Sequence, residues 1–168
     1  AVKGMDMDKR YALKAPDKSV LRGLEGDAAN KYFSVFNNLI LSNKEFVFSG
    51  RNRRPPKDSI NAMLSFVYTL LANECAAALE TVGLDPYIGF MHTLRPGRQS
   101  LALDIMEEFR AYLGDRLVLT LINRKQVTQK DFVKQGDESV LMTENCRNLI
   151  IKSWQARKKE EIMHPYLK

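Results

Sequence analysis

The chain has little of what several classes of protein depend on. Its two cysteines, Cys75 and Cys146, are far apart and form no CxxC pair, so neither a disulfide framework nor a zinc site is indicated. No uninterrupted apolar run reaches the roughly 18 residues that a membrane span requires. Residues 1–16 lack the apolar core of a signal peptide. We therefore expect a protein of the reducing cytoplasm with no membrane partner.

Strand-like segments are also scarce. The only candidates are residues 46–50 and 117–122. The second lies between helical patterns, which makes a buried helix the better interpretation. The chain has 168 residues, of which 45% are hydrophobic and 27% charged. This composition is typical of one globular domain with a single core.

Helical periodicity, by contrast, dominates the chain. Apolar residues recur at steps of three and four in residues 17–41, 58–83, 100–111, 112–123 and 143–154. We expect Asp58 to cap the start of the second of these helices and Gly83 to follow its end, with Thr143 capping the last. The predicted fold is therefore all-α, a single multi-helix domain.

Basic residues outnumber acidic ones, which gives a net charge of +6 and an isoelectric point near 9.3. This balance favours a polyanionic partner only weakly, since many soluble domains are as basic. The loop 43–57 concentrates five of the basic residues: Lys44, Arg51, Arg53, Arg54 and Lys57. Such a loop can neutralise several phosphates, and a merely solvated loop explains it about as well. Asn61, Ser65 and Tyr68 follow as a polar stripe that either lines a site or satisfies buried groups.

One of the two histidines stands just ahead of two carboxylates. His92 lies in a loop marked by glycine and proline, and Asp104 and Glu107 follow one helical turn apart, so both can point at one place. Oxygen ligands with a single imidazole suit Mg²⁺ or Mn²⁺ better than a closed zinc site. The alternative is a solvated acidic stripe beside a structural histidine. The other histidine, His164, is expected to be structural.

Glu25 interrupts an apolar stripe on the first predicted helix. We expect this acid to be buried or half-buried, and it then needs a cationic partner. A salt bridge to Arg22 or another basic residue is the simpler explanation, and a metal ion is the alternative. Gly23 and Gly26 flank the acid although each lowers helix stability by about 1 kcal/mol relative to alanine. Their presence indicates that something approaches the backbone closely.

Four runs of sequence together resemble a known family. The runs are RGLEGDAANKYF, FSGRNRRPPKDSINAMLSFVYTLL, GLDPYIGFMHTLRPGRQSLALDIMEEFR and DRLVLTLINRKQV. Over residues 20–165 the chain resembles the CRISPR-associated endonuclease and integrase of spacer adaptation, the first-numbered Cas protein, and most closely its type I-C members. The resemblance implies the C-terminal helical catalytic domain of that family without its N-terminal β domain. Residues 1–16 would be a linker remnant and residues 17–168 the catalytic domain.

The resemblance also implies a site and a reaction. In this family the glutamate of RGxEG, the histidine of GLDPxxGxxH and an acid on the next helix bind Mg²⁺ or Mn²⁺. These positions fall on Glu25, His92 and Glu107 here, with Asp104 as a nearby second acid, and the resemblance leaves open which of Asp104 and Glu107 holds the ion. The implied DNA contacts are Arg51, Arg53, Arg54, Lys57, Asn61 and Tyr68. In the implied reaction, the 3′-hydroxyl of a short foreign DNA attacks a phosphodiester of the CRISPR repeat.

The implied partners are DNA, a second copy in the full-length homodimer, and the second-numbered Cas adaptation protein. Two rival hypotheses remain at this point. The first is a helical scaffold that binds DNA or a partner protein and is catalytically inactive without the β domain. The second is a metal-dependent nuclease that hydrolyses branched DNA without strand transfer.

Overall fold

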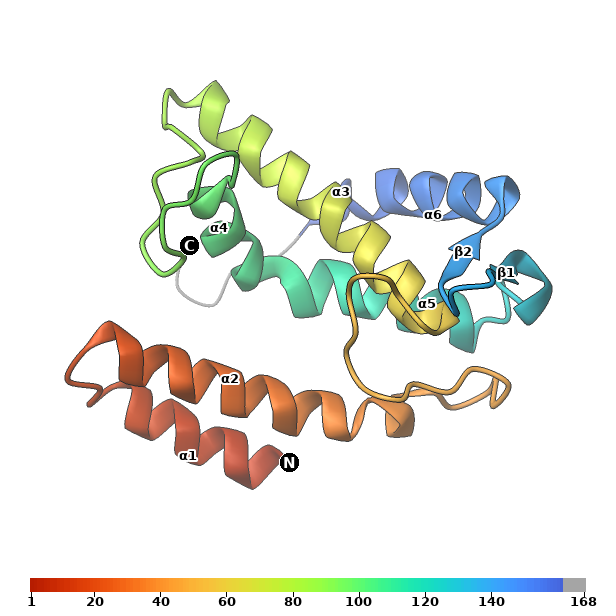
Figure 1. Ribbon diagram of the computed structural model, residues 1–168, viewed down its shortest axis with the longest axis horizontal. Helices are drawn as coiled ribbons and strands as arrows, with labels where there is room; N and C mark the ends of the chain where they lie inside the picture. Colours follow the sequence, from red (N-terminus) through yellow and green to blue (C-terminus); the bar gives the residue numbers. More distant parts are fainter. Residues whose placement is uncertain (162–168) are drawn as a thin grey trace.

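A computed structural model of the chain describes residues 1–161 (Figure 1). His164 and the end of the predicted domain 17–168 lie outside the described residues. In chain order the helices and strands are α1 (Val2–Ala12), α2 (Lys18–Ser34), the 3-10 helix η1 (Phe36–Leu39), α3 (Ser59–Thr81), α4 (Ser100–Phe109), the π-helical segment η2 (Arg110–Asp115), α5 (Arg116–Asn123), the 3-10 helix η3 (Gln129–Asp131), β1 (Phe132–Lys134), β2 (Val140–Met142) and α6 (Glu144–Arg157).

The all-α prediction is confirmed, with one small exception. Residues 117–122 lie inside the helix α5, as predicted, and residues 46–50 form no strand. The exception is an antiparallel hairpin in which Phe132 pairs with Met142 and Lys134 with Val140. The sequence did not predict this hairpin, because strands of three residues are too short to show an alternating pattern.

The predicted helix caps are confirmed. The Asp58 carboxylate accepts a hydrogen bond of 2.8 Å from the backbone N–H of Asn61 at the start of α3. Gly83, with φ of +78°, follows the end of the same helix in the left-handed conformation that glycine adopts without strain. The Thr143 hydroxyl accepts a bond of 3.3 Å from the N–H of Cys146 at the start of α6. Each of these caps contributes about 1 kcal/mol to helix stability.

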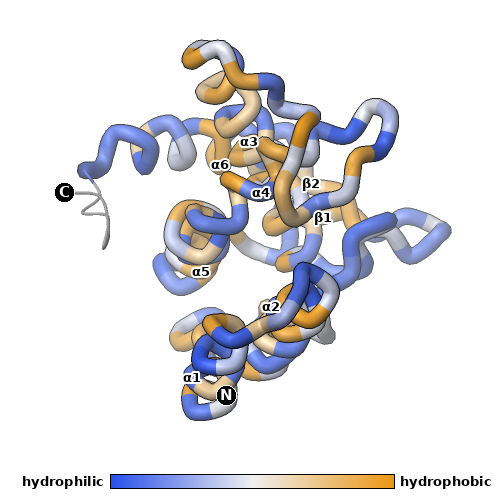
Figure 2. The backbone as a smooth tube through the Cα atoms, turned by 90° about the vertical axis from the view of Figure 1, so that its left-hand side faces the viewer, coloured by the Kyte–Doolittle hydropathy of each residue, from blue (hydrophilic) through white to orange (hydrophobic). Residues whose placement is uncertain are grey.

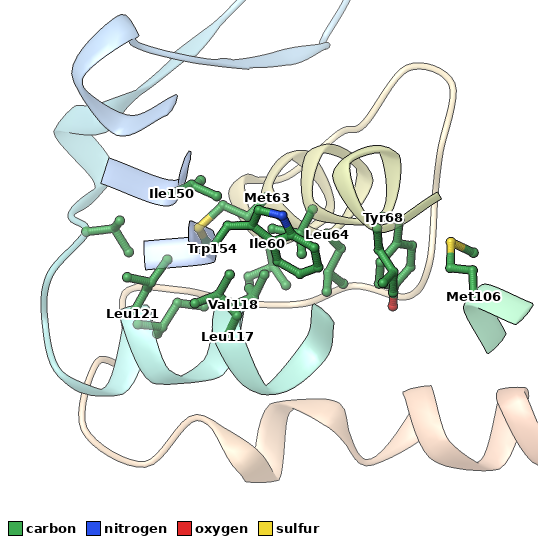
Figure 3. Packing of buried hydrophobic residues seen from close by; sticks show 14 of the residues in the cluster. Ile60, Met63, Leu64, Tyr68, Met106, Leu117, Val118, Leu121, Ile150 and Trp154 are labelled. Atoms are coloured by element: carbon green, nitrogen blue, oxygen red, sulfur yellow. The ribbon is translucent and has the colours of Figure 1, made fainter. Parts of the chain in front are cut away.

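The helix α3 forms the spine of the core (Figure 3). It packs between α4, α5 and α6, and its apolar side chains meet those of its neighbours. The fully buried side chains of this core include Ile60, Met63, Leu64, Val118, Leu121, Ile150 and Trp154. Burial of each contributes roughly 1.5–3 kcal/mol. By length and composition α3 could also cross a membrane, but half of its most apolar window is buried inside the structure, as in the core helix of a soluble protein.

The helices α1 and α2 form a hairpin along one side of the other helices (Figures 1 and 2). The segment expected to be a linker remnant therefore carries a helix of its own, α1, which packs along α2. Lys31 joins the two, because its ammonium lies 2.8 Å from the Asp8 carboxylate and 2.6 Å from that of Asp27. No residue of α2 is fully buried, but Tyr32 and Phe33 near its end pack against the core.

Candidate active site

The carboxylate of Asp104 on α4 holds the loop that carries His92. It accepts hydrogen bonds from the backbone N–H groups of Phe90, Met91 and His92, the last two at 2.9 Å. Its Oδ1 also lies 2.6 Å from the imidazole Nδ1 of His92. Burial raises the pKa of Asp104, but these hydrogen bonds outweigh burial and the pKa is lowered. Asp104 is therefore a carboxylate anion that fixes the imidazole ring.

The way in which His92 is held determines what its ring can do. A carboxylate at Nδ1 stabilises the tautomer that carries its proton there. In this tautomer the lone pair of Nε2 is available to a metal ion. This carboxylate–histidine pair is the usual arrangement around a metal-binding histidine. Gly89 lets the loop approach α4, since a Cβ at this position would lie 2.6 Å from the Cβ of Ser100 and 2.7 Å from its carbonyl carbon. The glycine before His92 is thus required by the packing.

Glu107 lies one turn further along α4 and is half-buried. Its carboxylate forms an ion pair of 2.9 Å with Arg110. Burial raises the pKa of Glu107, and the charge of Glu25 raises it further. Arg110 and His92 act in the opposite direction. Glu25 and His92 line one cavity, and His92 and Glu107 line a second, although the three residues come from α2, a loop and α4. The structure therefore brings the three predicted residues to one region.

Glu25 itself differs from the prediction in one respect. It was expected to be buried or half-buried, and it is exposed. The stripe on α2 is only partly covered, so the acid remains in contact with solvent. Its predicted salt bridge to Arg22 does not form, because the Arg22 guanidinium donates to the carbonyl oxygen of Met91. Within residues 1–161 Glu25 has no ion pair of its own.

Glu25 lines a cavity of about 330 Å³ together with Gly26, His92 and Arg98. A Cβ at Gly23 or at Gly26 would meet no atom within 4 Å, so nothing in the described chain approaches the backbone there. Glu25 and His92 both line this cavity. A ligand of this cavity would therefore contact both residues.

The three candidate ligands do not yet surround one point. Among residues 1–161, no three carboxylate, imidazole or thiolate groups are close enough together to hold a metal ion jointly. Glu107 is turned towards Arg110 and Glu25 lies exposed on the helix α2. The donor chemistry nevertheless fits a hard divalent ion, since one free imidazole nitrogen and two carboxylates are the ligands that Mn²⁺ or Mg²⁺ takes in proteins.

A second cavity, of about 360 Å³, adjoins the same His92 and is lined by Glu107 and Tyr68. The remaining charged residues around it are all arginines: Arg51, Arg53, Arg54, Arg98 and Arg110. Three of them were predicted as DNA contacts from the basic loop. Arg98 and Arg110 were not predicted, although each is close in sequence to a candidate ligand. The cavity therefore combines a carboxylate and an imidazole with a strongly cationic wall.

The other predicted DNA contacts have different positions. Asn61 is fully buried and bonds Arg51 at 2.8 Å, the N–H of Asn52 at 3.1 Å and the carbonyl of Gly50 at 2.8 Å. It holds the basic loop in place and does not face solvent. Lys57 lies in another cavity, with Phe132 and Val140. It pairs there with Glu138 at 3.7 Å.

A buried network connects the basic loop to the helices. The hydroxyl of Tyr68 donates to the carboxylate of Asp115, which is 1% exposed, and the hydroxyl of Tyr32 faces the same carboxylate. Burial raises the pKa of Asp115, and the two tyrosines oppose the shift. Arg51 and Arg110 lie over the ring of Tyr68 at 5.2 and 5.7 Å. This network could not be predicted from the sequence, because its members are far apart in the chain.

Comparison with known proteins gives concordant matches. Residues 1–156 match the protein family described as CRISPR associated protein Cas1. The CRISPR-associated endonuclease Cas1 2 of Rhodospirillum rubrum is 52% identical over 160 residues, which cover 95% of this chain and 46% of that protein. The chain spans about half the length of the curated relatives it matches.

Solved structures share the fold. A casposase bound to integration product is 31% identical and has a TM-score of 0.85 over 95% of this chain and 45% of its own. A chain of the Cas6-RT-Cas1–Cas2 complex is 32% identical, with a TM-score of 0.83 over 90% of this chain and 17% of its own. Both agree with the helical architecture in Figure 1.

Proposed function

Because the chain belongs to the family of CRISPR associated protein Cas1, we propose that it is the C-terminal helical catalytic domain of a DNA endonuclease and integrase, of type I-C. The observation that carries the proposal is the imidazole of His92, fixed by Asp104 at 2.6 Å and adjoining both a carboxylate, Glu107, and a cavity walled by arginines. A fixed imidazole donor beside a carboxylate suits a metal ion, and arginines suit phosphates.

In this proposal Glu25, Nε2 of His92 and Glu107 hold Mg²⁺ or Mn²⁺, while Asp104 orients the histidine. When bound, the ion supplies charge neutralisation at a phosphate oxygen and lowers the pKa of an attacking hydroxyl or water. Glu107 must leave Arg110 to reach the ion. The freed guanidinium is then available to a phosphate oxygen in the same cavity.

The side chains of the cavity position the reacting DNA. Arg53, Arg54 and Arg98 neutralise the backbone phosphates, and Arg51 and Tyr68, locked by their own hydrogen bonds, fix the wall against which the strand lies. In strand transfer the 3′-hydroxyl oxygen of the incoming DNA forms a new bond to phosphorus. The bond to the former 3′-oxygen of the target strand breaks, and that oxygen takes up a proton. Hydrolysis differs only in the use of water as the nucleophile.

The proposed partners follow from the solved relatives. One of these holds an integration product, and another belongs to a complex with Cas2, so we include DNA and the second-numbered adaptation protein as partners. We also include a homodimer of the full-length protein and a cytoplasmic location. The scaffold hypothesis remains the alternative for the chain in isolation.

The test is a strand-transfer assay on the full-length protein with its adaptation partner. His92→Ala is expected to abolish joining of a short duplex to a leader–repeat target, while the melting temperature stays near that of the wild type. Joining at the wild-type rate by His92→Ala would refute the site. Hydrolysis of branched DNA without any joining would favour the nuclease hypothesis.

A further inference from the structure

A second cationic groove lies between α5 and α6, lined by residues other than those of the candidate active site. Its volume is about 390 Å³. Its lining is polar on both helices, with Arg116, Thr120 and Arg124 on the α5 side and Ser153 and Arg157 on the α6 side. None of these residues takes part in the site around His92. The groove therefore needs an explanation of its own.

Two arginines of the groove have no carboxylate partner. Arg116 and Arg124 are exposed, and within residues 1–161 neither forms an ion pair. The one acid of the lining, Glu160, is paired with Arg157 at 3.3 Å. The groove thus carries two uncompensated positive charges. Such exposed and unpaired guanidinium groups are available to an anionic partner.

An aromatic ring is fixed at one end of the groove. The Arg157 guanidinium stacks on Tyr112 at 5.0 Å and donates to its carbonyl oxygen at 3.1 Å, and the Arg116 guanidinium lies 5.7 Å from the same ring. Arg157 is therefore committed to the fold, whereas the exposed Arg116 is held in place by the ring with its donors still available. Stacking on an aromatic ring leaves the edge of a guanidinium free for bidentate bonds to phosphate.

The spacing matches a nucleic-acid backbone. Arg116 and Arg124 are eight residues apart on or just beyond one helix, which corresponds to roughly 12 Å at helical rise. Successive phosphates of one DNA strand follow at about 3.4 Å of helix axis, so the two arginines span three to four phosphates. Thr120, whose hydroxyl donates to the carbonyl oxygen of Arg116 at 2.6 Å, and Ser153 line the same groove.

We propose that this groove is a second binding site for the DNA backbone, separate from the candidate active site, and that Arg116 and Arg124 are its principal contacts. The segment η2 connects the two sites, because Arg110 at its start lines the active-site cavity and Tyr112 lines the groove. A duplex that passes over η2 would be held in the groove while its phosphate is presented to His92. The inference rests on the proposed function for the identity of its ligand.

The test is fluorescence anisotropy with this chain and a labelled duplex of about 30 base pairs, in EDTA, over a series of salt concentrations. Each phosphate contact contributes about 0.9 to the slope of log K against log salt. The double variant R116A/R124A is expected to lower this slope by about two and the affinity by at least about tenfold at low salt. Circular dichroism confirms that the variant is folded.

Three further variants make the result specific. R116K/R124K keeps both charges and is expected to retain most of the slope. K9A/R10A removes the same charge from the exposed end of α1 and is expected to leave the slope unchanged. E160Q frees Arg157 from its partner and is expected to tighten binding. If R116A/R124A has the same slope as the wild type, or if K9A/R10A lowers the slope by the same amount as R116A/R124A, the groove is not a DNA-binding site.

The outcomes separate this inference from the proposed function. If the wild-type chain binds duplex DNA with a slope that depends on Arg116 and Arg124, the groove is confirmed whether or not the chain performs chemistry. If the chain binds DNA and the slope depends only on Arg53 and Arg54, the groove is refuted and the active-site cavity remains. If the wild-type chain binds no DNA, both the groove and the DNA partner of the proposed function fail.

Discussion

The two sides of the candidate active site are built in opposite ways. On the α4 side, Asp104 accepts three backbone N–H groups and contacts the ring of His92, and the helix is anchored by buried residues. On the α2 side, Glu25 is exposed on a helix with no buried residue. The imidazole is therefore preorganised, whereas the opposite carboxylate is not.

The end of α2 packs against the core through Tyr32 and Phe33, and polar contacts attach its beginning to the loop that carries His92. Arg22 donates to the carbonyl of Met91, and Lys18 donates to that of Phe90 at 3.1 Å. Both therefore attach α2 to the loop that carries His92. Near its other end Tyr32 faces the buried Asp115. These contacts keep Glu25 near His92 without fixing its distance, which agrees with the absence of three converged ligands among residues 1–161.

The largest expected effect separates two adjacent acids on α4. Glu107→Ala in the full-length protein is expected to abolish strand transfer, because a metal ligand is lost. Glu108→Ala is the matched control, since Glu108 lines neither of the two cavities beside His92, and it should retain activity. Rates of joining on the same substrate measure both. Equal activity of the two variants would remove Glu107 from the site.

A smaller effect is expected where Asp104 acts through His92. Asp104→Asn keeps the shape but removes the anion, and loss of such an orienting carboxylate lowers metal affinity by about 10–100-fold. Glu25→Ala is expected to lower metal affinity as well, yet to leave the unfolding free energy unchanged, because the residue is exposed. Metal titration and urea unfolding of both variants distinguish positioning from ligation. Wild-type metal affinity in Asp104→Asn would show that the imidazole does not need its carboxylate.

The smallest effect concerns the wall of the cavity. Tyr68→Phe removes one of the two hydroxyls that face the buried Asp115, and we expect this to lower the free energy of unfolding by about 1–3 kcal/mol. Tyr11→Phe is the control, since Tyr11 is 57% exposed and surface changes usually stay within about 0.5 kcal/mol. Urea denaturation measures both. Equal stability of the two variants would mean that the network around Asp115 does not support the fold.

The sequence predicted much of this molecule, for reasons that can be named. Helical periodicity and the caps Asp58 and Thr143 are local signals, so the helices from α2 to α6 and two of their starts were recovered, whereas α1 was not predicted. The hairpin of β1 and β2 was missed, because three-residue strands leave no period to read. Glu25 was expected to be buried, since a stripe shows which face of a helix is apolar but not how deeply that face is covered.

The candidate site was likewise predicted only in part. The candidate ligands could be predicted from residue type and spacing, with the family resemblance supplying their roles. The hydrogen bonds from the His92 loop to Asp104 could not be predicted. The resemblance placed Asp104 among the ligands, and only the fold brings it under that loop. Arg110 and Asp115 were missed for the same reason. Their partners, Glu107 and Tyr68, become neighbours only through the packing of α3 against α4 and η2.

The central claim is that Glu25, His92 and Glu107 together hold one divalent ion. Calorimetric titration of Mn²⁺ into this chain tests it directly, with His92→Ala as the comparison. The account predicts binding of one ion per wild-type chain and loss of that binding in His92→Ala. Equal binding by the two proteins, or no binding by either, would contradict the account, and the second result would favour a helical scaffold.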